Sequence, residues 1–132
     1  MTICELTFDG GSKGNPGHGY GSFRLTCGGE EVALERLDYG ATPPVTNNQA
    51  EYLTLIHGLQ RLRAHRGTAL AETTVVVRGD SQLVINQVLG RWKVNNLGLQ
   101  PLQKQARELL TGFARKELLW HARANSVRVL GH

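Results

Sequence analysis

Apolar and polar residues alternate over three successive segments near the start of the chain, residues 3–9, 20–27 and 31–39. A repeat of two residues is typical of β-strands that bury one face, so each segment is predicted to be a strand. The Gly28-Gly29 pair separates the second segment from the third and suits a tight turn. The three strands are therefore expected to form an antiparallel meander, which the prolines at 43–44 end.

The first predicted strand ends in Asp9 and gives way to residues 10–17, which hold four glycines, a proline and an asparagine. Helix and strand interiors tolerate such a composition poorly, and glycine lets the backbone approach a ligand closely. This segment is predicted to be a ligand-binding loop with a carboxylate at its entrance. Asp9-Gly10 is also a strong hairpin-turn signal, and the stretch by itself leaves that alternative open.

A helix is predicted to begin just after the two prolines. Thr46 can act as its N-cap, and Gln49 can close a capping box. Apolar residues then recur with helical spacing, which indicates a face packed on the core. They are Tyr52, Leu55, Ile56, Leu59 and Leu62. Glu51 falls in the first turn of this helix.

The second half of the chain alternates between apolar strands and amphipathic helices. In order, the pattern predicts a loop at 64–73, a buried strand at 74–77, a helix at 81–89, an irregular basic connection at 90–96, a helix at 99–113, a strand at 116–120 and at most about two helical turns at 125–132. Asp80 falls where the buried strand passes to the next helix. Its position mirrors that of Asp9 in the first strand.

These elements predict an α/β fold, a five-stranded mixed sheet with helices on both faces, formed by residues 1–132 as a single domain. Strands one to three form the meander, and strands four and five run parallel to strand one. A crossover through the first helix brings the strand ends that carry Asp9 and Asp80 to the same edge. Glu51 can point there too, and ligands of such sheets collect at that edge.

The composition of the chain indicates what kind of partner it binds and in which cellular compartment it is expected. Fifteen Lys and Arg against eleven Asp and Glu give a net charge of +4 and a pI near 9.4, which suits a polyanion. Aromatic residues are only 6% of the chain, so contacts to a nucleic-acid backbone are favoured over base stacking. Cys4 and Cys27 are expected to be buried free thiols. Without a targeting or membrane-spanning pattern, a soluble cytoplasmic protein is expected.

Asp9, Glu51 and Asp80 would repel one another at one edge unless a cation neutralised them. Carboxylate oxygens without Cys or paired His ligands suit Mg²⁺ or Mn²⁺ rather than Zn²⁺. Two such ions about 3.5 to 4 Å apart would activate water and stabilise the leaving oxygen in an attack on a phosphodiester. Taken singly, the three acids have ordinary explanations as a turn residue, a first-turn acid favoured by the helix dipole and an N-cap.

Three ordered motifs carry a resemblance that runs nearly end to end: Phe8 to Gly17, Thr46 to Glu51, and Asp80-Ser81-Gln82. They resemble the opening strand and loop, the Thr-Asn-Asn-x-x-Glu helix start and the Asp-Ser-Gln of type 1 ribonuclease H. The resemblance implies a metal-dependent endonuclease that cuts the RNA strand of RNA/DNA hybrids and leaves 5′-phosphate and 3′-hydroxyl ends. It also implies that the three acids are metal ligands.

The chain departs from the family at the fourth acidic position, where members usually carry a segment like Asn-x-x-Ala-Asp-x-Leu. The matching residues are 121–127, with Asn125 in place of the aspartate. An amide oxygen can coordinate Mg²⁺ but brings no charge, so weaker metal binding and reduced activity are expected. In a second register, residues 129–132 resemble the Gly-His loop of some members, and the fourth ligand is missing. His121 is expected to be a structural hydrogen bonder.

Polar residues that flank the acids are the candidates for reading the 2′-hydroxyl of a hybrid. They are Ser12, Asn15, Asn47, Asn48, Gln49, Ser81 and Gln82, with Arg91, Trp92 and Lys93 as candidates for contacts to the DNA-strand phosphates. Local roles in turns and caps are the alternative for several of them, and Trp92 could simply pack on a helix. A monomer without an obligatory protein partner is expected.

Two other functions remain open on the sequence. Asn125 also suits a catalytically weak module that binds hybrids or structured nucleic acid, and such a module would show no metal-dependent cleavage. The same acids serve nuclease-fold domains that act on DNA. Cleavage that survives the replacement of ribose by deoxyribose would indicate a nuclease that acts on DNA.

Overall fold

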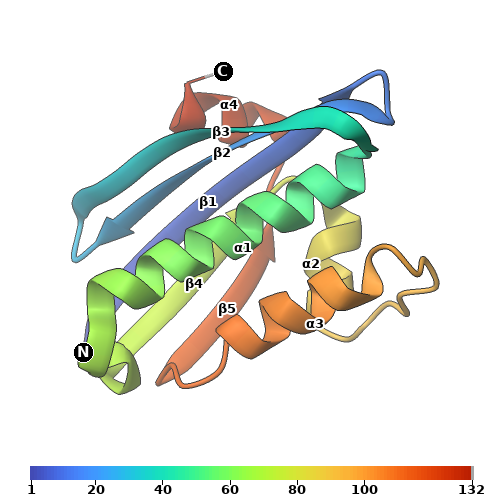
Figure 1. Cartoon of the computed structure of the whole chain (residues 1–132). Coiled ribbons are helices and arrows are strands. Elements are labelled where there is room, and N and C mark those ends of the chain that lie inside the picture. The colour runs from blue at the N-terminus through green and yellow to red at the C-terminus, as the bar shows by residue number, and fades with distance from the viewer. Residues whose placement is uncertain (132) are drawn as a thin grey trace.

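The computed structural model describes residues 1–131, which form five strands, four α-helices and a short 3-10 helix (Figure 1). The strands are β1 (Thr2–Lys13), β2 (Gly17–Cys27), β3 (Glu30–Val45), β4 (Thr73–Gly79) and β5 (Arg115–Trp120). The helices are α1 (Asn47–Arg66), the 3-10 helix η1 (Gly67–Glu72), α2 (Gln82–Val88), α3 (Gln100–Leu109) and α4 (Arg123–Leu130). In the described part of the chain, no helix combines the length and the apolar character that crossing a membrane requires.

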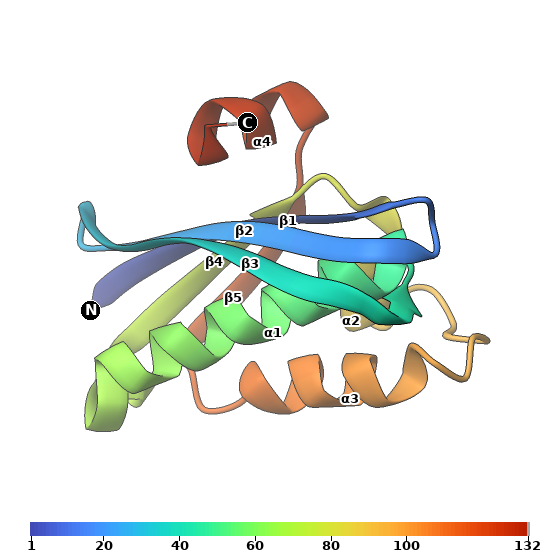
Figure 2. The same ribbon diagram turned by 45° about the horizontal axis from the view of Figure 1, so that its top comes forward.

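All five strands belong to one sheet in the order β3-β2-β1-β4-β5, which confirms the predicted fold. β1, β2 and β3 are antiparallel neighbours, while β4 pairs parallel with β1 and β5 pairs parallel with β4. α1 and α3 cover one face of the sheet, and α4 lies over the other face (Figure 2). β1 is therefore central, and the residues that follow its buried part lie at the edge where ligands of such sheets collect.

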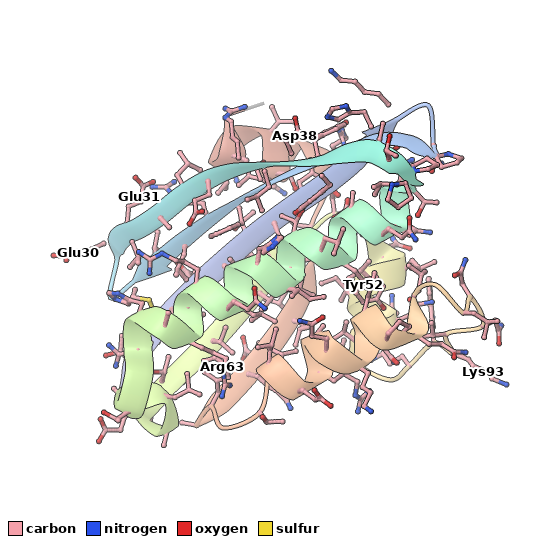
Figure 3. The ribbon with its side chains drawn as sticks, in the orientation of Figure 1. Glu30, Glu31, Asp38, Tyr52, Arg63 and Lys93 are labelled. Carbon is pink, nitrogen blue, oxygen red and sulfur yellow. A yellow bond between two sulfur atoms is a disulfide. The ribbon has the colours of Figure 1, made fainter. Side chains whose placement is uncertain are left out.

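The core lies between α1 and the sheet face that α1 covers. Cys4, Leu6 and Phe8 of β1 are fully buried in it. The predicted apolar stripe of α1 is confirmed, because each of its five members is at most 4% exposed. Tyr52, labelled in Figure 3, also donates a hydrogen bond from its hydroxyl to Gln87 Oε1 at 2.7 Å, which joins α1 to α2.

α1 begins where the sequence predicts. The Gln49 backbone N–H donates to Thr46 Oγ1 at 3.1 Å, and Gln49 Oε1 accepts from the Thr46 backbone N–H at 2.9 Å, which completes the capping box. The predicted end of the meander at the prolines is wrong, because β3 continues through them to Val45. β3 is an edge strand, so a proline that lacks an N–H can be accommodated there.

The glycine-rich segment is largely strand rather than loop, which corrects the prediction. β1 runs on through Gly10 and Gly11 to Lys13, and Gly10 pairs with Gly21 across β2. The hairpin turn is confined to residues 14–16, so it does not begin at Asp9-Gly10 either. These strand glycines provide space rather than flexibility. A Cβ atom at Gly10 would lie 2.5 Å from the carbonyl carbon of Ala50 in α1.

Further boundaries differ from the sequence prediction, among them the start of α4, which lies at Arg123 rather than at residue 125. The segment at 64–73, predicted to be a loop, contains the end of α1, then η1 and the first residue of β4. Gly67 follows the end of α1 with a φ of 52°, a positive value that favours glycine. The predicted helix at 99–113 is shorter, because α3 ends at Leu109 and its apolar pattern continues into the turn beyond.

The prediction of free thiols is wrong, because Cys4 and Cys27 form a disulfide (Figure 3). The antiparallel register places Cys4 directly opposite Cys27, with their Cα atoms 4.1 Å apart. That register depends on where the hairpin turns, and the sequence pattern placed the turn several residues too early. The disulfide therefore closes the open end of the β1–β2 hairpin.

Candidate active site

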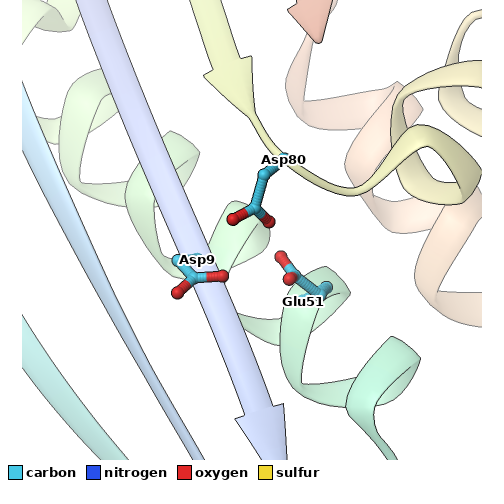
Figure 4. Close-up of side chains that lie close together, drawn as sticks. All are labelled: Asp9, Glu51 and Asp80. Atoms are coloured by element: carbon cyan, nitrogen blue, oxygen red, sulfur yellow. The ribbon is translucent and has the colours of Figure 1, made fainter. Parts of the chain in front are cut away.

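Three acidic side chains meet at one edge of the sheet, as the sequence predicts (Figure 4). Asp9 comes from β1, Glu51 from α1, and Asp80 from the residue that follows β4. One carboxylate oxygen from each lies within 4.8 Å of those of the other two. Asp9 is 4% exposed and Glu51 is 7% exposed, so most of this charge is withdrawn from solvent.

Backbone geometry brings the acids together. Parallel pairing sets Phe8 of β1 beside Gly79 of β4, so the next residues of the two strands, Asp9 and Asp80, are neighbours. Glu51 reaches them because α1 approaches β1 closely at Gly10, where any side chain would meet the α1 backbone. The Gly10 N–H also donates a hydrogen bond to the Glu51 carboxylate.

The ordinary explanations for the single acids do not fit the structure. Asp9 lies within β1 rather than in a turn. The first turn of α1 holds no acid, and Glu51 follows it, so the prediction that placed Glu51 in that turn is wrong. Asp80 is not an N-cap, because Ser81 caps α2 by accepting a hydrogen bond from the Val84 N–H at 3.2 Å.

Burial and mutual repulsion dominate the electrostatics of the cluster. Burial raises the pKa of Glu51 well above its ordinary value, and the charges of Asp9 and Asp80 raise it further. Burial and then Asp9 also raise the pKa of Asp80, while Arg123 and a hydrogen bond from Ser126 act in the opposite direction. Within residues 1–131, the buried Glu51 Oε2 accepts no hydrogen bond. Three oxygen donors with such an unsatisfied atom fit a hard divalent cation.

The raised pKa of Glu51 predicts how the stability of the metal-free protein depends on pH. A carboxyl that holds its proton more tightly in the folded chain stabilises the fold at low pH, and this stability is lost as the pH rises through the folded-state pKa. In EDTA at neutral pH, Glu51→Gln is therefore expected to be more stable than the wild type by about 1 kcal/mol. That difference corresponds to roughly 4 °C in Tm.

The measurement is a series of thermal unfolding curves from about pH 4 to pH 8, a range that spans the titration of a raised carboxyl. Glu117→Gln is the matched control, because Glu117 is exposed on β5. The Tm of the Glu117 variant should follow the wild-type curve. Parallel curves for Glu51→Gln and the wild type would contradict the expectation.

At the position where related proteins carry a fourth acid, this chain has Asn125. Asn125 lies in the first turn of α4, and its Oδ1 accepts a hydrogen bond from Arg128 Nη2 at 2.8 Å. Its role as a fourth ligand stays a prediction, and the hydrogen bond from Arg128 uses one of the two lone pairs of Oδ1. The second register is wrong, because Val129 and Leu130 lie within α4 and form no loop ahead of it. Its last residue, His132, lies outside the described residues.

Three residues that the sequence did not single out surround Asp80. Arg123 Nη1 lies 3.7 Å from Asp80 Oδ2, and the Trp120 Nε1–H donates to the Asp80 carbonyl at 3.0 Å. Ser126 bonds both Asp80 and His121, whose Nε2 lies 2.8 Å from Ser126 Oγ. The expected structural role of His121 is thereby confirmed. The helical spacing of Ser126 and Leu130, both buried, was the signal that could have revealed this contact.

The polar residues near the first two acids mainly hold each other in place. The Ser12 N–H donates to Asn47 Oδ1 at 2.7 Å, and the Asn47 N–H donates to Asn15 Oδ1 at 3.0 Å. These bonds fasten the β1–β2 turn to the start of α1. The side chain of Gln49 is occupied by the capping box, whereas Asn48 is half-buried and appears in no such cap.

The second group of predicted contact residues lies farther along the chain. The Ser81 side chain is engaged as the N-cap of α2, and Gln82 beside it is exposed. Arg91, Trp92 and Lys93 are all exposed in the loop between α2 and α3, and Figure 3 shows Lys93 at the periphery of the molecule. Trp92 remains 47% exposed, so packing accounts for only part of its surface.

Comparisons with known proteins agree on one class. Residues 26–129 match the family model described as reverse transcriptase-like. Ribonuclease HI of Halobacterium salinarum is 40% identical over 106 residues, which cover 80% of this chain and 50% of that protein. The crystal structure of RNase H1 from the same archaeon superimposes with a TM-score of 0.82 at 38% identity, over 96% of this chain and 90% of that chain.

A second solved structure, LC11-RNase H1 in complex with an RNA/DNA hybrid, has a TM-score of 0.83 at 27% identity. The superposition covers 95% of this chain and 89% of that chain. The chain belongs to the ribonuclease H family. It spans between 31% and 50% of the length of the first curated relatives that it matches.

Proposed function

We propose that the chain is a ribonuclease H that hydrolyses the RNA strand of RNA/DNA hybrids and leaves 5′-phosphate and 3′-hydroxyl ends. The observation that carries the proposal is the convergence of Asp9, Glu51 and Asp80, three acids from separate elements, within 4.8 Å. Relatives named ribonuclease H support it, as does a similar structure solved in complex with a hybrid.

Asp9, Glu51 and Asp80 are the residues that would hold Mg²⁺ or Mn²⁺, with two ions in the catalytic complex. When bound, the ions supply an activated water and stabilisation of the leaving oxygen in an in-line displacement. A cation also removes the repulsion that raises the pKa of Glu51 in the metal-free site. Asn125, proposed as the fourth ligand, would add an oxygen but no charge.

The remaining residues of the site orient the acids. Trp120 holds the backbone of Asp80 through its indole N–H, and Ser126 donates to the Asp80 carboxylate. Gly10 holds the Glu51 carboxylate from the other side. Arg123 places a guanidinium beside Asp80, where it partly offsets the negative charge. The acids are therefore positioned before any substrate arrives.

Substrate choice is proposed to rest on the polar groups that flank the acids. Asn47 and Gln82 are exposed and lie near Glu51 and Asp80 along the chain, so they are the best placed to reach the minor groove and its 2′-hydroxyls. Asn47 would do so with its amide N–H groups, because its Oδ1 accepts from the Ser12 N–H. Asn48 is proposed to assist them. Ser12, Asn15, Gln49 and Ser81 would act mainly by holding this surface in shape, because hydrogen bonds within the chain engage them.

Contacts to the phosphates of the DNA strand are proposed for the exposed residues Arg91, Trp92 and Lys93. Affinity that depends on such contacts falls steeply with salt, since each one releases a counterion. We also propose that residues 1–132 act as a single, monomeric domain in the cytoplasm without an obligatory protein partner.

The alternative proposal is a module of the same fold that binds hybrids but cleaves them weakly. The hydrogen bond from Arg128 to Asn125 favours it, because it engages the one oxygen that the fourth position offers. The two proposals differ in a single experiment. A labelled RNA/DNA hybrid is incubated with the protein and with Mg²⁺ or Mn²⁺, beside duplex DNA and duplex RNA.

Metal-dependent cleavage of the RNA strand alone would establish the hydrolase. Binding of the hybrid without cleavage under either metal would leave the binding module. Cleavage that persists when the ribose at the cut site is replaced by deoxyribose would instead place the protein among nucleases that act on DNA.

Asn125→Asp is expected to increase hybrid cleavage at limiting Mg²⁺ by about tenfold, the scale on which supporting groups change metal affinity. A carboxylate adds the charge that the amide lacks and competes better for the cation. The measurement is the initial cleavage rate against Mg²⁺ concentration. Asn95→Asp adds the same charge in an exposed loop and should leave the Mg²⁺ dependence unchanged. If the Asn125 variant shows the same Mg²⁺ dependence as the Asn95 control, Asn125 is not a metal ligand.

A further inference from the structure

A cavity of about 410 Å³ lies between the sheet and α4, and none of the three acids lines it. Its floor is formed by β1, β2 and β4, and α4 forms its wall with Asn125, Arg128 and Val129. Figure 2 shows α4 lying over this face of the sheet. The proposed function makes no use of the basic residues that line the cavity.

Strand register places two arginines in one row across the floor. Thr7 of β1 pairs with Arg24 of β2 on one side and with Arg78 of β4 on the other. Adjacent strands are about 4.8 Å apart, so the two arginines rise from positions roughly 10 Å apart. Asp9 follows two residues after Thr7 on the same face, which puts its carboxylate about 7 Å along the strand.

A third arginine comes from α4, so three elements supply guanidinium groups to one cavity. Arg128 donates to the neutral amide of Asn125 and has no ion pair among residues 1–131. Arg78 pairs with Glu5 at 2.9 Å, and among residues 1–131 Glu5 is the one carboxylate that lines the cavity. Glu31, outside the lining, pairs with Arg24 at 3.0 Å. The lining therefore carries more positive than negative charge.

Arg24 is also incompletely satisfied. Its Nε is buried and lies 3.0 Å from Glu31 Oε1, but without the geometry of a hydrogen bond. Like charges held in a partly enclosed space repel one another, and a bound anion relieves that repulsion. Among the described residues, the cavity thus combines the guanidinium of Arg128, which has no ion pair, with an Arg24 Nε–H whose contact to Glu31 lacks the geometry of a hydrogen bond.

We propose that this arginine cavity binds a phosphate monoester, either that of a free mononucleotide or the 5′-phosphate end of a nucleic-acid strand. Guanidinium groups match phosphate oxygens in paired hydrogen bonds, and the hydroxyls of Thr7 and Thr26 add donors at the floor. The volume is that of a small-molecule site and too small for a duplex. The proposal does not depend on cleavage by the three acids.

The test is calorimetric titration in EDTA, so that no metal can hold phosphate at the acids. Inorganic phosphate and adenosine 5′-monophosphate are the first probes. Wild-type protein should bind both, and Arg128→Gln should weaken binding about tenfold or more, the scale of one charge-assisted hydrogen bond. Arg115→Gln is the matched control, because Arg115 is exposed on β5 outside the cavity and carries the same charge.

Arg24→Gln provides a second variant, and thermal unfolding shows that each variant is folded. Asp9→Asn should bind the probes at least as well as the wild type, since it removes a nearby negative charge. Loss of binding in Asp9→Asn would show that binding depends on the three acids rather than on the arginines and would overturn the proposal. Equal binding by the Arg128 and Arg115 variants, or no binding at about 10 mM probe, a concentration that saturates millimolar sites, would also overturn it.

A second pair of probes separates the two sources of the phosphate. A trinucleotide with a 5′-phosphate is compared with the same trinucleotide ending in a 5′-hydroxyl. Tighter binding of the phosphorylated trinucleotide than of the mononucleotide would identify a strand end as the ligand. Tighter binding of the mononucleotide would identify a free nucleotide. Equal binding of the two trinucleotides would show that the monoester is not recognised and would contradict the proposal.

Discussion

Asp9→Asn is expected to lower hybrid cleavage by on the order of 10³-fold or more while the protein stays folded. Asparagine keeps the size of the side chain and one oxygen but removes the charge that a divalent cation needs at this position. Because Asp9 is buried beside Glu51 and Asp80, the substitution also relieves repulsion, so the metal-free Tm should not fall. The measurements are cleavage of a labelled hybrid and thermal unfolding in EDTA.

Asp38→Asn is the matched control for this experiment. Asp38 is exposed on β3, where Figure 3 shows it and where it pairs with His18 at 2.6 Å. The Asp38→Asn substitution is the same isosteric change, made away from the three acids. Its cleavage rate should stay within about twofold of the wild-type rate, since exposed ion pairs contribute little. Cleavage by Asp9→Asn that matches the Asp38 variant would rule out the three-acid site as the catalytic centre.

Gly10→Ala is expected to have the next largest effect, on both stability and cleavage. The added Cβ would lie 2.5 Å from the carbonyl carbon of Ala50, so α1 and β1 must separate. Overpacking of this kind costs about 1 to 3 kcal/mol. The separation carries Glu51 away from Asp9, and a displacement of about 1 Å at a catalytic group can cost roughly 10²-fold in rate.

Denaturant unfolding and hybrid cleavage measure the two effects of Gly10→Ala. Gly98→Ala is the matched control, because a Cβ there approaches only the ends of the Asn96 and Gln49 side chains. Those side chains can move, so the Gly98 variant should be nearly as stable and active as the wild type. If Gly10→Ala is as stable as the wild type, the α1 backbone does not approach Gly10 closely enough to exclude a side chain.

The sequence reveals the elements whose pattern is local. The alternation of apolar and polar residues in β1 and the capping box at Thr46 could both be predicted, because each depends on residues within a few positions of one another. The convergence of Asp9 and Asp80 was also predictable, since the handedness of the crossover leaves few arrangements for the two strands. Local pattern and topology together were enough to locate the three acids.

Features that depend on close approach between distant segments were not predictable. Gly10 and Gly11 look like loop residues by composition, yet they lie in β1, paired with Gly21 and Tyr20 of β2. At Gly10 the α1 backbone leaves no room for a side chain. The disulfide of Cys4 and Cys27 depends on strand register, which the misplaced turn concealed. The contact of Arg123 with Asp80 depends on how the short helix α4 lies across the sheet.

The origin of the three acids also bears on when activity can appear during the life of the chain. Asp9 and Glu51 belong to the first half of the sequence, but Asp80 is brought beside Asp9 only when β4 pairs with β1. Pairing between segments so distant in sequence forms slowly compared with helices and hairpins. A partly synthesised chain that ends before Thr73 would carry two of the acids and an unpaired edge on β1. If the three acids cleave hybrids as proposed, cleavage would report the completion of folding, and a nascent chain would stay inactive until its fourth strand had docked.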